Sequence, residues 1–231
     1  ALNLLRSLTI HPSGLSRPLS AKVWVSGWLR MAIGVGLLLS PSALTISAGV
    51  AQNIPAGVAA PTQNYPVLVV NPVGGDDANG DGSDRAPFKT ITRALQVAQT
   101  AAVIQLMPGT YSEEMGEQFP LQLKPGIVLQ GNPQTRGADI LIRGSGLFIS
   151  STSARQQVTI LGAKQAALVG VTVTNPHRQG YGLWIESTNP TVTDNTFTGN
   201  GHDGISVVGN ATPLIRNNYF YQNLANGITI Y

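Results

Sequence analysis

Residues 190–208 read PTVTDNTFTGNGHDGISVV, and residues 213–231 read PLIRNNYFYQNLANGITIY. The two segments align without a gap at a spacing of 23 residues, and a fainter copy with a shorter loop precedes them. A fixed period of this length indicates a stacked array of one small structural unit. The matching pairs are Pro190 and Pro213, Val192 and Ile215, Asn195 and Asn218, Phe197 and Phe220, Asn200 and Asn223, and Ile205 and Ile228.

Apolar and polar residues alternate within each unit, as in Gly204-Ile205-Ser206-Val207-Val208. Alternation with a period of two predicts β-strands, and the units are too short for strand–helix–strand crossovers. One unit alone cannot bury its apolar face, so successive units must wind around a common axis and stack. We therefore expect an all-β solenoid, a parallel β-helix with coils of about 22–24 residues. A leucine-rich repeat has a similar length, but its Leu-x-x-Leu-x-Leu pattern is missing.

The repeated asparagines have a structural interpretation and a functional one. Asparagine tolerates left-handed backbone and caps turns, so it recurs where a coil bends. Asn195 with Asn218, and Asn200 with Asn223, would then stack into side-chain ladders. A ligand role is the alternative, and we favour the ladders.

Composition limits the classes of protein to consider. The 231 residues suit one domain, and 26 Gly and 15 Pro with only 11% charged residues suit a turn-rich β protein. The chain has no cysteine, which excludes disulfides and thiol chemistry. A formal charge of +3, carried by scattered basic residues, argues against nucleic acid as a partner.

The N-terminal part has the pattern of an export signal. Residues 1–30 show no periodicity, and we expect a disordered extension there. Lys22 and Arg30 form a basic flank before residues 31–51, which combine a short apolar run with small residues at its end, and this pattern predicts a signal peptide. A membrane anchor is the alternative, but Pro41 interrupts a run far shorter than about 20 apolar residues. We expect an exported protein (secreted, periplasmic or at the cell surface) with no membrane span after cleavage, and a linker over 52–66.

An acidic loop follows the first expected strand. Asp77-x-Asn79-x-Asp81-Gly82 matches the first half of a calcium-binding loop, and Asp84 offers a further oxygen. The twelfth position is Phe88, where an EF-hand needs a bidentate Glu. These oxygens make Ca²⁺ the candidate cofactor, while a metal-free turn is the favoured alternative.

Residues 87–98 predict the one helix of the domain. Ile91, Ala94, Leu95 and Ala98 form one apolar stripe, and Thr90 is a candidate N-cap. We expect this short helix to cap the N-terminal end of a β-helix domain over 67–231. The sequence stops within a repeat and without a polar cap, so we expect further coils in a longer protein.

Several segments resemble the opening of the pectin-lyase-like superfamily of single-stranded right-handed parallel β-helices. The resemblance spans about residues 67–231 and is strongest to a domain-of-unknown-function subfamily of exported bacterial proteins. It implies a right-handed coil and binding of long glycans along an exposed sheet face. It also implies, for many members, lyase, hydrolase or epimerase activity on uronic-acid polymers. The segments are Gly80-Asp81-Gly82-Ser83, Pro87-Phe88-Lys89-Thr90-Ile91, Ile104-Gln105-Leu106, Pro108-Gly109-Thr110-Tyr111 and the Asn-x-Phe-x-x-Asn units.

Two neighbouring loops hold the candidate catalytic residues, His177-Arg178 in one and His202-Asp203 in the other. Uronan chemistry needs a cation against the sugar carboxylate and a base near the C5 proton, and these residue types supply both. The segment Asn175-Pro176-His177-Arg178 resembles the Asp-Pro-His-Asp motif of alginate C5-epimerases, but both acids are replaced. An ordinary surface loop is the alternative.

Aromatic residues are candidates for stacking on sugar rings. Alternation points Trp184 and Glu186 away from the core, and Tyr181 lies beside them. Tyr219 and Tyr221 should also face outward. Packing under an adjacent loop is the alternative for these aromatic rings.

Two functions therefore remain open. The first is a non-catalytic exported β-helix that binds polysaccharide, with acidic polymers among the candidates, or serves as a cell-envelope or surface scaffold. The second is a polysaccharide-modifying enzyme, a lyase, glycoside hydrolase or uronan C5-epimerase. We favour the first, because no pair of carboxylates recurs on one sheet face.

Overall fold

The computed structural model describes residues 65–231. The expected extension, the signal peptide and most of the linker therefore lie outside the described residues. Within residues 65–231, no helix has the length and hydrophobicity that a membrane crossing requires.

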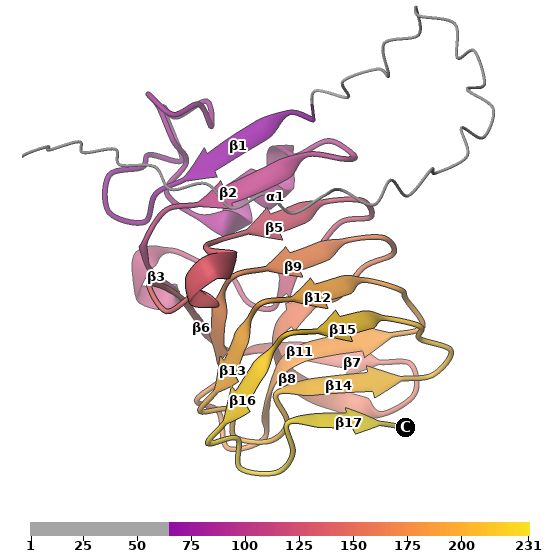
Figure 1. The fold of residues 1–231 in the computed structure, drawn as a ribbon. Coiled ribbons are helices and arrows are strands. Elements are labelled where there is room, and N and C mark those ends of the chain that lie inside the picture. The colour runs from indigo at the N-terminus through magenta and orange to yellow at the C-terminus, as the bar shows by residue number, and fades with distance from the viewer. Residues whose placement is uncertain (1–64) are drawn as a thin grey trace, which may run out of the picture. The chain divides into compact units, whose positions relative to one another are not determined.

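Three parallel sheets make up the domain, and the chain visits them in turn (Figure 1). The first sheet contains β1 (Val67–Val70), β2 (Val103–Leu106), β5 (Val128–Gln130), β9 (Ala167–Val169), β12 (Thr191–Thr193) and β15 (Leu214–Arg216). The second contains β3 (Gly109–Ser112), β6 (Ile140–Arg143), β10 (Thr172–Thr174), β13 (Thr196–Thr198) and β16 (Tyr219–Tyr221). The third contains β4 (Leu121–Gln122), β8 (Ala154–Leu161), β11 (Gly180–Glu186), β14 (Ile205–Val208) and β17 (Ile228–Ile230).

From β2 onward, each coil contributes one strand to each sheet, so the fold is a parallel β-helix. The repeat sets the register: Val192 pairs with Ile215 between β12 and β15, as the spacing predicts. Phe197 pairs with Phe220 between β13 and β16, and their rings stack with centroids 5.3 Å apart. The predicted parallel β architecture, with strands of successive coils paired at the spacing of the repeat, is confirmed.

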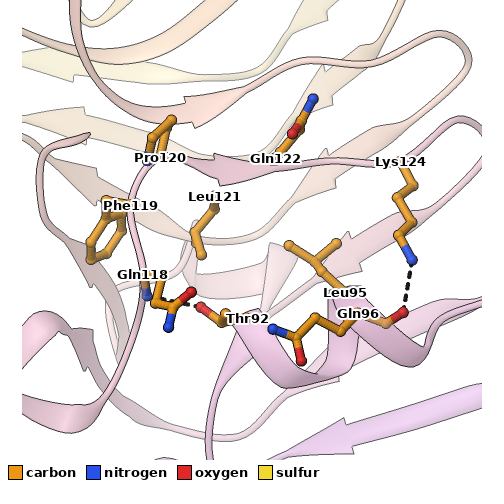
Figure 2. A pocket seen from close by; sticks show the side chains of 9 residues that line it. All are labelled: Thr92, Leu95, Gln96, Gln118, Phe119, Pro120, Leu121, Gln122 and Lys124. Carbon is orange, nitrogen blue, oxygen red and sulfur yellow. Dashed lines mark hydrogen bonds between the residues drawn. The ribbon is translucent and has the colours of Figure 1, made fainter. Parts of the chain in front are cut away.

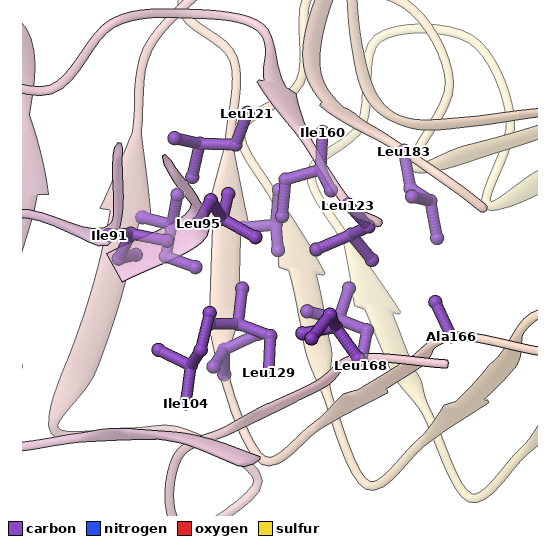
Figure 3. Packing of buried hydrophobic residues seen from close by; sticks show 14 of the residues in the cluster. Ile91, Leu95, Ile104, Leu121, Leu123, Leu129, Ile160, Ala166, Leu168 and Leu183 are labelled. Carbon is purple, nitrogen blue, oxygen red and sulfur yellow. The ribbon is translucent and has the colours of Figure 1, made fainter. Parts of the chain in front are cut away.

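The core runs through the middle of the coils. Ile104, Leu129 and Leu168 are in register on adjacent strands of the first sheet and have no exposed surface (Figure 3). Burying one such side chain contributes about 1.5–3 kcal/mol relative to leaving it in water. Because each coil adds another layer of these residues, burial holds the stack together.

The asparagine ladders are confirmed, with one refinement. Asn200 Nδ2 donates to Asn223 Oδ1 at 2.7 Å, and the equivalent bond joins Asn195 to Asn218. The left-handed backbone, however, belongs to the residue before each turn asparagine. Asp194 has a φ of 56°, and its equivalent Asn217 has 55°. The asparagines thus satisfy backbone groups of the turn rather than adopting its strained conformation.

The helix α1 (Ile91–Val97) packs beside the first coil, and polar groups satisfy both of its ends. Thr90 Oγ1 accepts from the Arg93 amide, and the buried Glu117 carboxylate accepts from the amides of Ile91 and Thr92. At the other end, Lys124 Nζ donates to carbonyl oxygens of the last turn. Side chains from the segment leading into and out of β4 therefore fix the helix in place.

One element departs from the repeat. Strand β7 (Gly146–Ser150) turns back against β8 as an antiparallel hairpin on the third sheet. A second apolar cluster lies there, separate from the coil interior, and Phe148 of β7 packs against it. Its buried members are Val158, Leu161, Tyr181, Trp184 and Val208.

Candidate functional site

A groove of about 520 Å³, here called the hairpin groove, lies on the outer face of the third sheet beside the β7–β8 hairpin. Its lining combines aromatic rings with hydroxyl and amide groups, which is the composition of a specific small-molecule site. The lining residues are Thr152, Ser153, Gln156, Tyr181, Trp184, Val208, Gly209 and Tyr231.

Trp184 points away from the coil interior, as alternation predicts, and its ring is packed rather than exposed, which is the alternative that the sequence left open. Only 2% of the residue is exposed, because it lies in the second apolar cluster beside the hairpin. Tyr181 is also buried, with its ring 5.1 Å from that of Trp184 in an edge-to-face arrangement. Of the groove's aromatic residues, Tyr231 alone is widely exposed, at 67%. A ligand would therefore meet Tyr231 first and only the edges of the buried rings.

Glu186 anchors the tip of the hairpin. Its Oε2 accepts from Trp184 Nε1 at 3.0 Å, and its Oε1 accepts from the amide and hydroxyl of Thr152 at 3.1 Å. Burial opposes ionisation of Glu186, but the hydrogen bonds outweigh it and hold its pKa below the ordinary value. Glu186 thus stabilises the groove wall, and its oxygens are already occupied.

His202 and Asp203 form a close pair next to the groove. His202 Nδ1 lies 3.2 Å from Asp203 Oδ1, and Asp203 has no exposed surface. The carboxylate is fixed by bonds from the Asn226 amide and the Ser206 hydroxyl. The His202 side chain is 34% exposed, and its ring centroid lies 4.7 Å from that of Tyr181. The contact is not a hydrogen bond, however, and His202 Nδ1 is buried without a hydrogen-bond partner, so Asp203 lies beside the imidazole without fixing its tautomer.

The other two predicted catalytic residues, His177 and Arg178, lie in the adjacent coil. The two loops are joined where the His202 amide donates to the carbonyl of Gly180 at 2.9 Å. His177 and Arg178 are both exposed, and His177 lines a different hollow of about 330 Å³. The structure therefore brings the loops together without bringing the two histidine side chains into one site.

That second hollow, here called the charged pocket, contains residues that sequence reasoning missed. Glu113 and Glu114 follow β3, Arg143 ends β6, and His177 follows β10. A hydrogen bond with Ser112, helped by the charge of Arg143, lowers the pKa of Glu114. Ser112, Arg143 and Thr174 are paired on neighbouring strands of the second sheet, and this pairing brings the pocket residues together. It could not be found from the sequence, because the early coils depart too far from the 23-residue repeat.

The predicted calcium residues serve as turn and backbone partners. Asp77 Oδ1 accepts from the amides of Lys89 and Thr90, and its Oδ2 accepts from the Thr90 hydroxyl. Asp81 accepts from the amide of Ser83. Asn79 donates to Asp76, and Asp84 is exposed. In the described part of the chain, no three His, Cys, Asp or Glu side chains are arranged to hold a metal ion.

Tyr219 and Tyr221 are exposed, at 54% and 41%, as the alternation predicts. Both belong to β16 of the second sheet, so they are not part of the hairpin groove. The candidate sugar-stacking residues are therefore divided between two faces of the β-helix.

A further cleft of about 320 Å³ lies between α1 and β4 (Figure 2). Amide side chains such as Gln118 and apolar residues such as Phe119 line it. The ammonium group of Lys124 is bound to the carbonyl oxygens of Gln96 and Ala98. Lys124 is the one charged residue among those that line the cleft, and it is bound to the end of the helix. The cleft therefore offers no free group for acid–base chemistry.

Comparisons with known proteins give a family and distant structural likenesses. No curated protein matches the sequence. One similar solved structure is pectin methylesterase PemA from Erwinia chrysanthemi, with 19% identity, a TM-score of 0.38, and 66% of this chain and 47% of that chain covered. Another is the GH136 lacto-N-biosidase from Eubacterium ramulus, with 16% identity, a TM-score of 0.39, and 71% and 40% covered. This chain spans less than half of either structure, and both likenesses are too distant to carry an argument about activity.

The family model described as "Protein of unknown function (DUF1565)" matches residues 73–231. This stretch begins in the acidic loop after β1 and includes α1 and all the later strands. Because the match covers more than half of the chain, the chain belongs to the DUF1565 family.

Proposed function

We propose that this chain is an exported β-helix protein that binds polysaccharide, either as a binding module or as a scaffold at the cell envelope or surface. The hairpin groove carries the proposal. It sets the aromatic edges of Tyr181 and Trp184 and the exposed ring of Tyr231 against a polar rim that includes Gln156 and Thr152. A sugar ring has an apolar face and a polar edge, and this pairing of surfaces matches it.

The proposal includes finer points of architecture and location. We infer a right-handed coil, because crossovers between parallel strands of one sheet are right-handed in nearly all proteins. We infer that α1 closes the N-terminal end of the coil, since its residues Ile91, Ala94 and Leu95 are buried. Export rests on the signal-peptide pattern of residues 31–51.

The test is binding of the full chain to a panel of neutral and acidic oligosaccharides, measured by calorimetry. Tyr231→Ala and Gln156→Ala should each weaken binding by about threefold or more, because each removes a stacking or hydrogen-bonding surface. Leu214→Ala is the control, since Leu214 is 54% exposed but belongs to the first sheet. Unchanged affinity for every bound glycan in both groove variants would sink the proposal.

A second function, polysaccharide modification, is favoured by one observation. His202 Nδ1 lies 3.2 Å from the buried Asp203 carboxylate, and the ring is partly exposed beside Tyr181. In this function His202 Nε2 takes a proton from the bound sugar or from water. The assay is release of unsaturated or reducing sugar from polysaccharides by the full chain. His202→Ala should abolish release and His177→Ala should not, because His177 lines the charged pocket.

A further inference from the structure

The outer face of the second sheet carries a second groove, of about 530 Å³, here called the threonine groove. It lies across the strands, so it runs along the axis of the β-helix. It shares no lining residue with the hairpin groove. Its lining residues are Ala138, Leu141, Thr172, Thr174, Thr196, Thr198, Tyr219 and Tyr221.

Strand register arranges these side chains in two rows. In one row Leu141, Thr172, Thr196 and Tyr219 pair in sequence from β6 to β16. In the other row Thr198 pairs with Tyr221, and Thr174 lies two residues beyond Thr172 on β10. Neighbouring strands are about 4.8 Å apart, so the same types of group recur at that interval along the axis. A recurrent surface of this kind suits an extended polymer.

The two rows have different tasks. The hydroxyls of Thr172 and Thr196 donate to the carbonyls of Gly137 and Arg136, at 2.7 and 3.0 Å. These bonds fix the loop before β6 along one side of the groove. Thr174 and Thr198 lie in the other row, nearer the open side, and both are half-buried. The groove thus has one fixed wall and a floor with hydroxyl groups.

The tyrosines supply an aromatic platform at one end. Their ring centroids are 5.1 Å apart, and the planes are tilted by 38°. Tyr219 is 54% exposed and Tyr221 is 41% exposed, so a ligand can reach both rings. Tyrosine offers a large apolar surface with a polar tip, which fits the two kinds of surface on a sugar.

The lining residues are all uncharged at neutral pH. The guanidinium nearest in the register belongs to Arg143, opposite Thr174, and it lines the charged pocket instead. Without a compensating cation in the groove, an acidic polymer would lose the hydration of its carboxylates and gain no ion pair. The lining therefore favours a neutral ligand.

We propose that the threonine groove is a second carbohydrate site that binds a neutral polysaccharide laid along the helix axis. Stacking on Tyr219 and Tyr221 and hydrogen bonds to Thr174 and Thr198 hold the chain. The proposal goes beyond the function assigned to the hairpin groove, because the ligand class and the residues differ. With this second site, the protein engages glycans on two faces.

The experiment is calorimetry of the full chain with cellohexaose, xylohexaose and mannohexaose, with polygalacturonate for comparison. Tyr219→Ala and Tyr221→Ala should each weaken binding of a neutral hexasaccharide by about threefold to tenfold, the range expected for a lost stacking partner. Tyr221→Phe should retain binding, because the ring remains. Leu214→Ala is the control, because Leu214 is 54% exposed and lines neither groove, while Tyr231→Ala reports separately on the hairpin groove.

The salt dependence of the binding affinity distinguishes a neutral ligand from an acidic one. Binding of the neutral hexasaccharide should be the same at low and at about 0.5 M salt, because no ion pair forms. Binding that falls with salt, or that is found for polygalacturonate alone, overturns the proposal. Binding that Tyr231→Ala weakens and Tyr219→Ala and Tyr221→Ala do not also overturns it, while leaving the proposed function of the hairpin groove intact. A thermal unfolding curve for each variant verifies that the exposed substitutions have not disturbed the fold.

Discussion

Asn195 Nδ2 donates to Oδ1 of Asn218 at 3.0 Å, and to the carbonyl of Leu168 in the preceding coil at 2.9 Å. Its own Oδ1 accepts from the amide of Val171 at 3.0 Å. One buried side chain therefore joins three coils. Asparagine repeats can signal a ligand site, but here they hold the turns together.

We predict that Asn195→Ala lowers the free energy of unfolding by about 1–3 kcal/mol, because it leaves backbone groups of a buried turn without partners. Urea denaturation measures the change. Asn218→Ala is the control, since Asn218 is half-buried and water can replace some of its bonds. An equal loss in the two variants would contradict the role of burial.

Trp184 gives a second prediction about stability. Trp184→Ala should lower the free energy of unfolding by about 3–5 kcal/mol, as for a large buried aromatic residue. Tyr219→Ala should change it by about 0.5 kcal/mol or less, because the ring lies on the surface. Thermal unfolding of the two variants measures both. A stable Trp184→Ala variant that loses only glycan binding would restore the stacking role that burial argues against.

The pH dependence of stability should contain a contribution from Glu117. Burial raises the pKa of this carboxyl in the folded protein, against the opposing effect of hydrogen bonds from Thr92 and Ile91. The folded state therefore binds more protons than the unfolded state above the ordinary Glu pKa of about 4.3. Stability from this group is present below that pH and is lost as the pH rises through the raised folded pKa.

Glu117→Gln tests this sign. The variant should lose less stability than the unaltered protein between about pH 4 and neutral pH, because its side chain does not titrate. Urea denaturation at a series of pH values measures the difference. Parallel curves for the two proteins would mean that Glu117 does not titrate abnormally.

The acidic loop gives a prediction about metal. Asp77→Ala should lower the melting temperature, because the amides of Lys89 and Thr90 lose their shared acceptor. Removing calcium with EGTA should leave the melting temperature unchanged, because the Asp77 oxygens are already used by the protein. A fall on adding EGTA that calcium reverses would instead favour the calcium loop.

The late coils could be predicted from the sequence because they obey one period. The spacing of 23 residues places Phe197 on Phe220, and alternation directs both rings inward. These two rules determine the parallel sheets and the stacked core. They also place the His177 and His202 loops in neighbouring coils, because residues one period apart occupy equivalent positions in successive coils.

The rest of the candidate site depended on departures from the repeat. Alternation gives the direction of Trp184 but not what covers it, and its cover is a hairpin found in one coil. The charged pocket was missed for a related reason, since Glu113 and Arg143 belong to early coils of irregular length. Inserted and irregular segments are fixed by tertiary packing, which a periodic pattern does not contain.

The second apolar cluster has a mechanical consequence. In a plain solenoid each coil contacts mainly its neighbours, so a force applied to the ends should peel coils off singly. Releasing a coil of 23 residues would lengthen the chain by about 80 Å at full extension. The cluster, however, spans β8, β11 and β14 outside the coil interior, with Val158, Tyr181 and Val208 as its members from the three strands. The cluster adds contacts among these three coils outside the core. In single-molecule pulling experiments they should therefore unfold together, in one long extension step.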